Sequence, residues 1–211
     1  LNVVTVVDDD LPADVAAQMV PASETQLARV IAAIPAATTV AHEARVLRGD
    51  PALAIAALAA VERPDLLILG LHRMRPIADI FRETTMERIV RQVSCPVLLV
   101  SAPVAAPYRG VVVAVDFSPA AAAALRRAHA LAPEAPLTAV HAFHVPYRGL
   151  LPADTVSAFL GEAEAAEAEW RRTEPLPAVL GKVELIEGSV AQVLTASLSR
   201  SGADLLALGA H

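Results

Sequence analysis

Aspartate and serine side chains at the end of an apolar run are the first residues of this sequence that could contact a ligand. Asp116 follows the apolar run 111–115, and Ser118 comes two positions later, directly before a proline. A carboxylate and a hydroxyl at the end of a strand can hydrogen-bond the polar edge of a small molecule, but the same residue types also close ordinary turns. The sequence leaves both roles open for Asp116.

Catalysis and metal binding find little support among the other polar residues. No Gly-x-Ser-x-Gly elbow surrounds Ser118, which argues against nucleophilic hydrolysis. His141 and His144 are three apart on an extended segment, so they face opposite sides of a sheet and cannot share an ion. The acidic run 8–10 is typical of a solvated loop, and the lone Cys95 of a small core residue. We therefore predict no catalytic residue and no metal site.

An internal repeat dominates the sequence. Residues 65–72, Asp-Leu-Leu-Ile-Leu-Gly-Leu-His, recur as residues 204–211, Asp-Leu-Leu-Ala-Leu-Gly-Ala-His, and the match continues upstream. Each apolar run ends on a glycine, Gly70 or Gly209, as a buried parallel strand does when its carboxyl end delivers a loop to a ligand crevice. The glycines could approach a ligand or only permit a turn. The chain is therefore two copies of one unit.

Strands and helices are predicted to alternate along both copies, which implies right-handed crossovers and a parallel sheet. Pro21 should mark an interruption of the first helix or an unresolved break. Thr84 with Glu87 fits a capping box, and Ser118 before Pro119 fits a helix start. The predicted strands are 1–7, 44–47, 66–69, 95–100, 111–116, 137–143, 183–186 and 205–208, and the predicted helices are 12–33, 51–62, 84–93, 119–131, 153–171 and 189–200.

The two copies are complementary fragments of the repeating unit. The counterpart of residues 111–131 would precede the first copy, and the counterpart of residues 73–100 would follow the second. We expect a complete unit of about five strands and four helices, with about 30 further residues at each end of the chain. The predicted division is a first domain at 1–101, a linker at 102–109 and a second domain at 110–211.

Composition limits the partners and the location. The net charge is −6 and 55% of the residues are hydrophobic, with only 3% aromatic, so the predicted cores are aliphatic. Without a block of Lys or Arg, nothing in the sequence favours nucleic acid or an anionic membrane. The single cysteine cannot form an internal disulfide, and no apolar run reaches the roughly 18 residues of a membrane helix. We therefore expect a cytoplasmic protein.

Three motifs carry a resemblance to a known family. They are Val-Ala-Val-Asp-Phe-Ser-Pro at 113–119, the repeated Leu-Gly-x-His, and the run 84–100 that ends in Cys-Pro-Val-Leu-Leu-Val. Together they resemble the universal stress protein family over essentially the whole chain, as a tandem of two domains. The resemblance implies a flavodoxin-like, adenine nucleotide alpha hydrolase-like α/β fold with parallel five-stranded sheets in the order 3-2-1-4-5, each copy being incomplete here.

The resemblance also implies a nucleotide site in the second domain. Family members that bind ATP hold adenosine with the aspartate of the first strand and the tip of the second strand, and a glycine-rich loop cradles the phosphates. That phosphate loop would follow His211 and lies outside the sequence, so ATP in the second domain stays an open expectation. The matching positions are Ala114, Val115, Asp116, Ser118, Ala142, Leu208, Gly209 and His211.

In the first domain the corresponding crevice is degenerate. Gly70, His72 and Thr84 keep their positions in the family pattern, but Arg73 and Glu83 replace its second and third glycines. An arginine disfavours left-handed backbone, and a glutamate at a helix start places a carboxylate where a phosphate would bind. We predict that this domain binds nucleotide poorly. His72 and His211 could contact a ligand in the crevice, or each could only form a hydrogen bond within its own loop.

The resemblance implies a stress-response protein that acts by binding and regulation rather than by catalysis. The alternative is an ATP-binding regulator with the nucleotide in the second domain and slow hydrolysis. A nucleotide-activating enzyme would need a paired-basic or Ser-Gly-Gly phosphate signature, which the sequence lacks. The predicted partners are an adenine nucleotide and the protein itself, through an intrachain pseudo-dimer or a homodimer in which the strand at 97–100 pairs across the interface.

Overall fold

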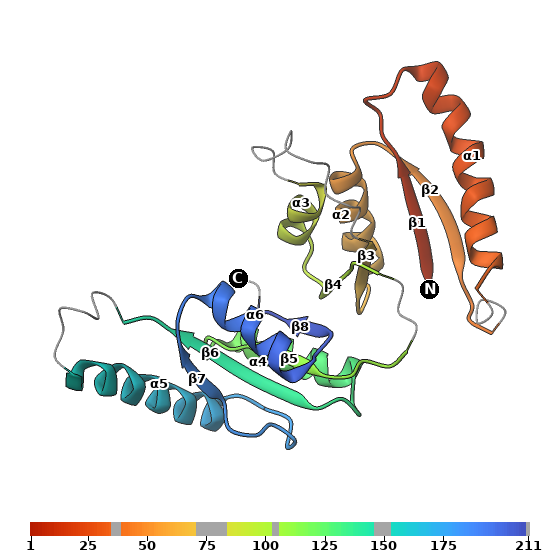
Figure 1. The fold of residues 1–211 in the computed structure, drawn as a ribbon. Coiled ribbons are helices and arrows are strands. Elements are labelled where there is room, and N and C mark those ends of the chain that lie inside the picture. The colour runs from red at the N-terminus through yellow and green to blue at the C-terminus, as the bar shows by residue number, and fades with distance from the viewer. Residues whose placement is uncertain (35–38, 71–83, 103–105, 146–152, 210–211) are drawn as a thin grey trace. The chain divides into compact units, whose positions relative to one another are not determined.

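The computed structural model describes residues 1–34, 39–70, 84–102, 106–145 and 153–209, and it is an α/β protein in which helices and strands alternate (Figure 1). The chain divides into two compact units, Leu1–Pro103 and Val104–His211. This division lies inside the predicted linker 102–109. Within the described residues, no helix is both long and apolar enough to cross a bilayer.

The first unit contains two short parallel sheets in its described part. One pairs β1 with β2 and the other pairs β3 with β4. Three helices accompany them, and α2 packs beside α3. The elements are β1 (Asn2–Val7), α1 (Ala13–Ala32), β2 (Glu43–Arg48), α2 (Pro51–Glu62), β3 (Leu67–Gly70), α3 (Thr85–Gln92) and β4 (Val97–Val100).

The second unit contains one parallel sheet with the strand order β7-β6-β5-β8, which is 3-2-1-4 in the numbering of the repeating unit. The central strand β5 is buried at Val111, Val112 and Val113. The elements are β5 (Val111–Ala114), α4 (Pro119–Leu131), β6 (Leu137–Phe143), α5 (Ala153–Thr173), β7 (Glu184–Glu187), α6 (Val190–Ser201) and β8 (Leu205–Ala207).

Strand registers are identical in the two copies. In the first unit Val4 of β1 lies opposite Arg45 of β2, and in the second unit their counterparts Val140 and Glu184 lie opposite each other. In both units a glycine with positive φ, 124° or 153°, follows the outer strand. Equivalent strands of the two units therefore pair in the same register.

Helix starts follow the predicted caps. The Ser118 hydroxyl accepts a hydrogen bond from Ala121 N at 3.1 Å, with proline as the first residue of α4. Thr84 and Glu87 form the predicted capping box at α3, and Asp50 caps α2. These short polar side chains satisfy backbone N–H groups that have no partner within the helix. The predicted starts of these three helices are confirmed.

The interruption predicted at Pro21 is wrong. One continuous helix, α1, runs from Ala13 to Ala32 with Pro21 inside it. A proline in a helix removes one backbone hydrogen bond and crowds the preceding turn. The helix contacts both β1 and β2, and tertiary packing outweighs local propensity in most helices.

Burial is concentrated in the second unit. Val112 and Val140 from the sheet pack with Val193 and Leu194 of α6, and all four side chains are at most 8% exposed. The sheet of the second unit therefore offers a well-packed base for a site at its strand ends.

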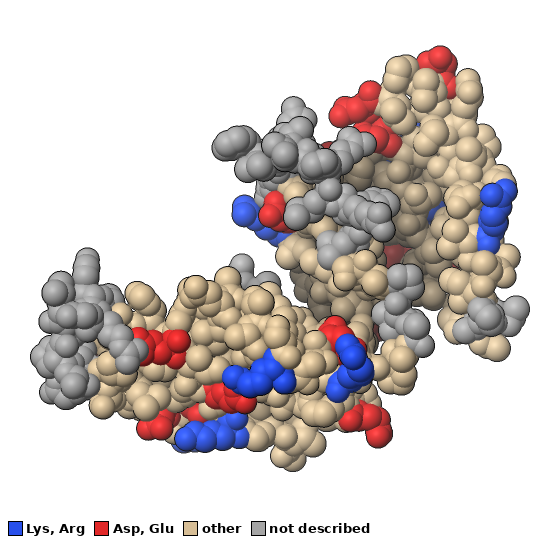
Figure 2. Space-filling model, in the orientation of Figure 1, with Lys and Arg blue, Asp and Glu red and all other residues tan. Residues whose placement is uncertain are grey.

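Charged side chains are mixed on the surface. On the face shown in Figure 2, basic side chains are scattered and several lie beside acidic ones, without a continuous basic patch.

Candidate functional site

The topology of the second unit selects one end of its sheet. The chain leaves β5 through α4 to reach β6 on one side, while β8 lies on the other side. In open parallel sheets, ligands bind outside the carboxyl ends of the strands where the direction of the connections reverses. That point falls between β5 and β8. The segments 115–118 and 208–209 leave the sheet there.

A compact turn joins β5 to α4. Asp116 Oδ1 accepts hydrogen bonds from Ser118 N at 3.0 Å and from Ser118 Oγ at 2.6 Å. The Ser118 hydroxyl thus donates to Asp116 while it also accepts from Ala121 N. Asp116 therefore closes the turn, one of its two predicted roles, while it remains exposed at the rim. Ser118 acts as a helix cap, and the turn sets a carboxylate beside the amino-terminal end of α4.

An aromatic cluster behind this turn holds it in place. Phe117 has a left-handed backbone with φ of 60°, and its ring centroid lies 4.5 Å from that of His141 and 5.9 Å from that of Trp170. Trp170 Nε1 donates to Ser118 O at 3.1 Å, and His141 Nδ1 lies 2.7 Å from Val115 O. A left-handed bulky residue persists only where its surroundings fix it. Here β6 and α5 provide that support.

The sequence does not predict this cluster. It offers His141 only as a candidate metal ligand and gives Trp170 no role. The available signal was that Trp170 is the only tryptophan in the chain and lies on the long predicted helix 153–171. A buried tryptophan needs a partner for its indole N–H, but the sequence does not say that the partner is the β5–α4 turn.

Gly209 lies against the first turn of α4. A Cβ atom at this position would lie 2.7 Å from Ala120 C and 2.7 Å from Ala121 N. Real Cβ atoms essentially never come this close to a backbone atom. The glycine therefore allows the chain after β8 to approach the helix. The structural reason for Gly209 is this close approach to the backbone of α4.

The other predicted positions of the second unit lie around the same strand ends. Val115 is buried, while Ala114 and Ala142 are half-buried at the carboxyl-terminal parts of β5 and β6. Leu208 directly follows β8 and is 56% exposed. His211 lies outside the described residues. The predicted set is thus brought together except for this histidine.

In the first unit, a carboxylate already occupies the start of α3. Thr84 Oγ accepts a hydrogen bond from Glu87 N at 3.2 Å, and Glu87 Oε2 accepts one from Thr84 N at 2.9 Å. The hydrogen bond from Thr84 N holds the pKa of Glu87 below its usual range. The hydroxyl that the family pattern assigns to phosphate is therefore engaged in a cap. His72, Arg73 and Glu83 lie outside the described residues.

A second carboxylate caps the neighbouring helix α2. Asp50 accepts from Leu53 N at 2.9 Å and pairs with both terminal nitrogens of Arg88, at 2.8 and 3.0 Å. The hydrogen bonds from Arg88, followed by that from Leu53 N, lower the pKa of Asp50. In the second unit the matching cap is the neutral Ser189. Near neutral pH, both of these helix starts in the first unit therefore hold an ionised carboxylate, and that of Asp50 is paired with the Arg88 guanidinium.

The acidic run after β1 is organised as a turn. Asp10 N donates to Asp8 Oδ1 at 3.0 Å, and Asp9 lies 3.9 Å from Arg48. Across the described segments, no group of three or more His, Cys, Asp or Glu side chains is placed to hold a metal ion. Cys95 is half-buried.

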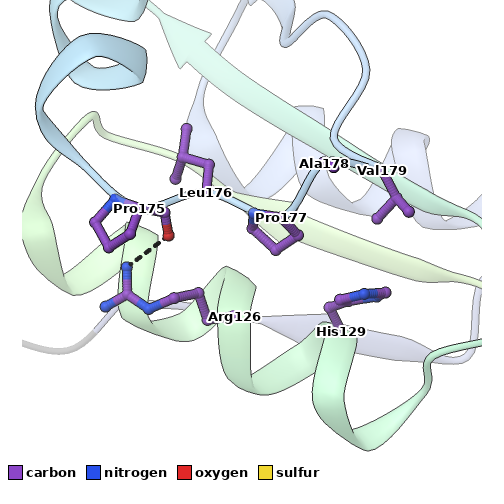
Figure 3. A pocket seen from close by; sticks show the side chains of 7 residues that line it. All are labelled: Arg126, His129, Pro175, Leu176, Pro177, Ala178 and Val179. Carbon is purple, nitrogen blue, oxygen red and sulfur yellow. Dashed lines mark hydrogen bonds between the residues drawn. The ribbon is translucent and has the colours of Figure 1, made fainter.

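A shallow pocket of about 440 Å³ lies elsewhere on the second unit (Figure 3). It is formed between α4 and the segment 175–179, and Arg126 donates to Pro175 O across it at 3.2 Å. Arg126 also lies 3.8 Å from Glu174. The guanidinium of Arg126 is therefore already paired. The pocket lies along the carboxyl-terminal half of α4, at the opposite end of that helix from the β5–α4 turn.

Comparison with known proteins identifies relatives of both halves of the chain. A sequence profile of the universal stress protein family matches residues 1–101 and 107–211. A universal stress protein from Archaeoglobus fulgidus DSM 4304 is 20% identical, with a TM-score of 0.69 over 97% of this chain and 72% of that chain. A functionally unknown protein from Pseudomonas aeruginosa PAO1 is 15% identical, with a TM-score of 0.56 over 97% and 80%. No curated protein matches significantly.

Proposed function

As the chain belongs to the universal stress protein family, we propose that it is a regulatory protein of the stress response that acts by binding an adenine nucleotide in its second unit. The adenosine lies at the carboxyl ends of β5, β6 and β8. Asp116 hydrogen-bonds its polar edge, and the half-buried Ala142 and exposed Leu208 contact its base.

The observation that supports this proposal most is the braced β5–α4 turn at the switch point of the sheet. Asp116 is held by Ser118, and Phe117 behind it is packed against His141 and Trp170. A binding site gains affinity when its polar groups are fixed before the ligand arrives, because less entropy is lost on binding. A turn needed only to reverse the chain would not require a left-handed phenylalanine with this support.

The charges favour the second unit over the first. In the first unit, Glu87 and Asp50 place carboxylates at the starts of α3 and α2. A negative group at a helix start competes with the phosphate that would bind there. In the second unit, serines cap α4 and α6, and the carboxylate of Asp116 lies beside the start of α4. Only the start of α6 therefore lacks the capping carboxylate that its counterpart α2 carries.

The chemistry of the turn favours binding over turnover. The Ser118 hydroxyl is engaged both as a donor and as an acceptor within the turn, and His141 contacts the Val115 carbonyl oxygen. A serine nucleophile would need an imidazole within hydrogen-bond reach to take its proton.

Self-association is also part of this proposal, either as a pseudo-dimer of the two units within one chain or as a homodimer of two chains.

Calorimetric titration with adenosine and with Mg-ATP tests the proposal. We expect one site per chain, and Asp116→Ala should weaken it by about 10- to 100-fold, because a hydrogen bond to a charged group contributes about 1.5–3 kcal/mol. Thr84→Ala is the control in the first unit, because it changes the degenerate crevice there and should leave the affinity of the second unit unchanged. The proposal fails if neither ligand binds, or if Thr84→Ala weakens binding as much as Asp116→Ala does.

A further inference from the structure

We propose that this protein self-associates through the outer edges of its sheets, with β2 of one copy lying against β7 of a second copy. This surface does not include the nucleotide site, and it differs from the pairing of the strand at 97–100. β2 and β7 are equivalent strands, and each lies at one end of its sheet. Among the described residues, no further strand pairs with either of them at its outer edge. A strand of a second chain can therefore add there.

Alternate residues of β2 turn their backbone groups toward the outer edge. Gly49 N, just after β2, donates to Val7 O at 3.1 Å, so the odd-numbered residues of β2 face β1. In a parallel strand, successive residues bond opposite neighbours. Ala44 and Val46 therefore direct their N–H and C=O groups outward, where no strand of the described first unit pairs with them.

The outer edge of β7 has the same arrangement but is partly closed at its start. Gly188 N donates to Phe143 O at 2.9 Å, so the even-numbered residues of β7 face β6. Val183, directly before β7, faces outward, and its N–H is bonded to the Glu167 carboxylate of α5 at 3.1 Å. The part of the edge to which a strand can add is therefore centred on Leu185, the counterpart of Val46.

The two edges carry opposite charges at every charged position. The segment 43–48 reads Glu-Ala-Arg-Val-Leu-Arg, and its counterpart 182–187 reads Lys-Val-Glu-Leu-Ile-Glu. The apolar positions are alike in both. The inverted pairs are Glu43 with Lys182, Arg45 with Glu184, and Arg48 with Glu187. Two surfaces with equivalent shape and opposite charge are complementary to each other.

The folding of each unit does not dictate these signs. Arg45 pairs with Glu62 of α2 at 2.7 Å, and at the equivalent place Glu184 pairs with Arg200 of α6. The strand–helix ion pair is thus formed with either polarity. These four side chains are 30–56% exposed. Such exposed pairs contribute little to stability, so their members can also interact with an opposite charge on a second chain.

The charges select the unlike combination of edges. Two β2 edges in contact would bring Arg45 and Arg48 of both copies together, and two β7 edges would do the same with Glu184 and Glu187. Only β2 against β7 places cations near anions. Charged residues on an edge strand prevent indiscriminate pairing, while complementary charges favour one partner over others. The partner that fits each edge is therefore a second copy of this chain.

Two charge-exchanged variants test the proposal by sedimentation velocity. The first gives β2 the charges of β7, and the second gives β7 those of β2. In both, the helix residue of the strand–helix pair is exchanged as well, so that each ion pair is kept with reversed polarity. The first variant carries Glu43→Lys, Arg45→Glu, Arg48→Glu and Glu62→Arg, and the second carries Lys182→Glu, Glu184→Arg, Glu187→Arg and Arg200→Glu.

Each variant alone has two like edges and should self-associate about 10-fold or more weakly than the unmodified chain, because like charges in contact oppose binding. An equimolar mixture of the two variants should associate as the unmodified chain does, since every edge again meets an unlike one. Raising the salt from about 0.1 M to about 1 M should weaken the association of the unmodified chain. A mixture that associates no better than either variant alone would overturn the proposal, as would an unmodified chain that stays monomeric at submillimolar concentration.

Three controls keep the test decisive. Adenosine titration should give the same affinity for both variants, so a failure of the nucleotide proposal is seen separately. Leu99→Glu on β4 should leave the association unchanged, and association that persists in both variants but is lost with Leu99→Glu would overturn the proposal by placing the contact at β4. If an exchange lowers the unfolding midpoint, the single substitutions Arg45→Glu and Glu184→Arg repeat the mixing experiment with the same two outcomes.

Discussion

Gly209→Ala should lower the free energy of unfolding of the second unit by about 3 kcal/mol, the upper part of the range for overpacking a tight contact. The added Cβ would lie 2.7 Å from backbone atoms of Ala120 and Ala121, which cannot move without distorting the start of α4. Since that helix start carries the β5–α4 turn, the substitution should also weaken adenosine binding. Urea unfolding followed by the fluorescence of Trp170, the only tryptophan, reports on this unit alone.

Gly70→Ala is the matched control for this prediction. The same residue of the repeat is replaced, but the new Cβ meets no described atom within 4 Å. The expected change ranges from none to about 1 kcal/mol of stabilisation, because alanine restricts the unfolded chain. Unfolding followed by circular dichroism covers both units. Equal destabilisation by the two substitutions would mean that Gly209 does not depend on its contact with α4.

Trp170→Ala should destabilise the second unit by about 3–5 kcal/mol, as is typical when a large aromatic side chain is removed from a core. The side chain is 2% exposed, packs against Phe117 and donates a hydrogen bond to Ser118 O. Its removal takes away both the packing and the hydrogen bond that hold the turn. Circular dichroism in urea measures the stability, because the fluorescent residue is lost.

Trp170→Phe separates packing from the hydrogen bond. An aromatic ring is kept, while the indole N–H and part of the buried volume are lost, so the expected cost is more than the roughly 1 kcal/mol of one hydrogen bond but less than that of Trp170→Ala. Adenosine affinity should fall more with Trp170→Ala than with Trp170→Phe, because only the first removes the aromatic ring that packs against Phe117 from α5. If Trp170→Ala unfolds at the same urea concentration as the unsubstituted chain, α5 does not support the turn.

The repeat made much of the fold predictable from sequence. Because residues 65–72 and 204–211 match, one unit could be aligned on the other, and their shared register is what a common fold requires. The caps at Thr84 and Ser118 were predictable for a different reason: a short polar side chain at a helix start forms its hydrogen bonds within three residues. Interactions between residues that are close in the sequence can therefore be predicted from residue types and their spacing.

The bracing of the candidate site could not be predicted in the same way. Phe117, His141 and Trp170 are far apart in the chain, and nothing in their spacing indicates that they meet. The left-handed conformation of Phe117 cannot be predicted from sequence, because it is costly for a bulky residue. It occurs here because contacts that only the folded unit supplies offset that cost. Pro21 failed as a helix breaker for a related reason, since packing against β1 and β2 outweighs the lost hydrogen bond.

The most direct test of the central claim, that adenosine occupies the strand ends of the second unit, is amide chemical-shift mapping by NMR during a titration with adenosine. The account predicts saturable shifts centred on Asp116, Phe117 and Ser118, with further shifts at Ala142 and Leu208, and none at Gly70 or Thr84. Saturable shifts centred on Gly70 and Thr84 instead, or no shifts in the segment 115–118 at millimolar adenosine, would contradict it.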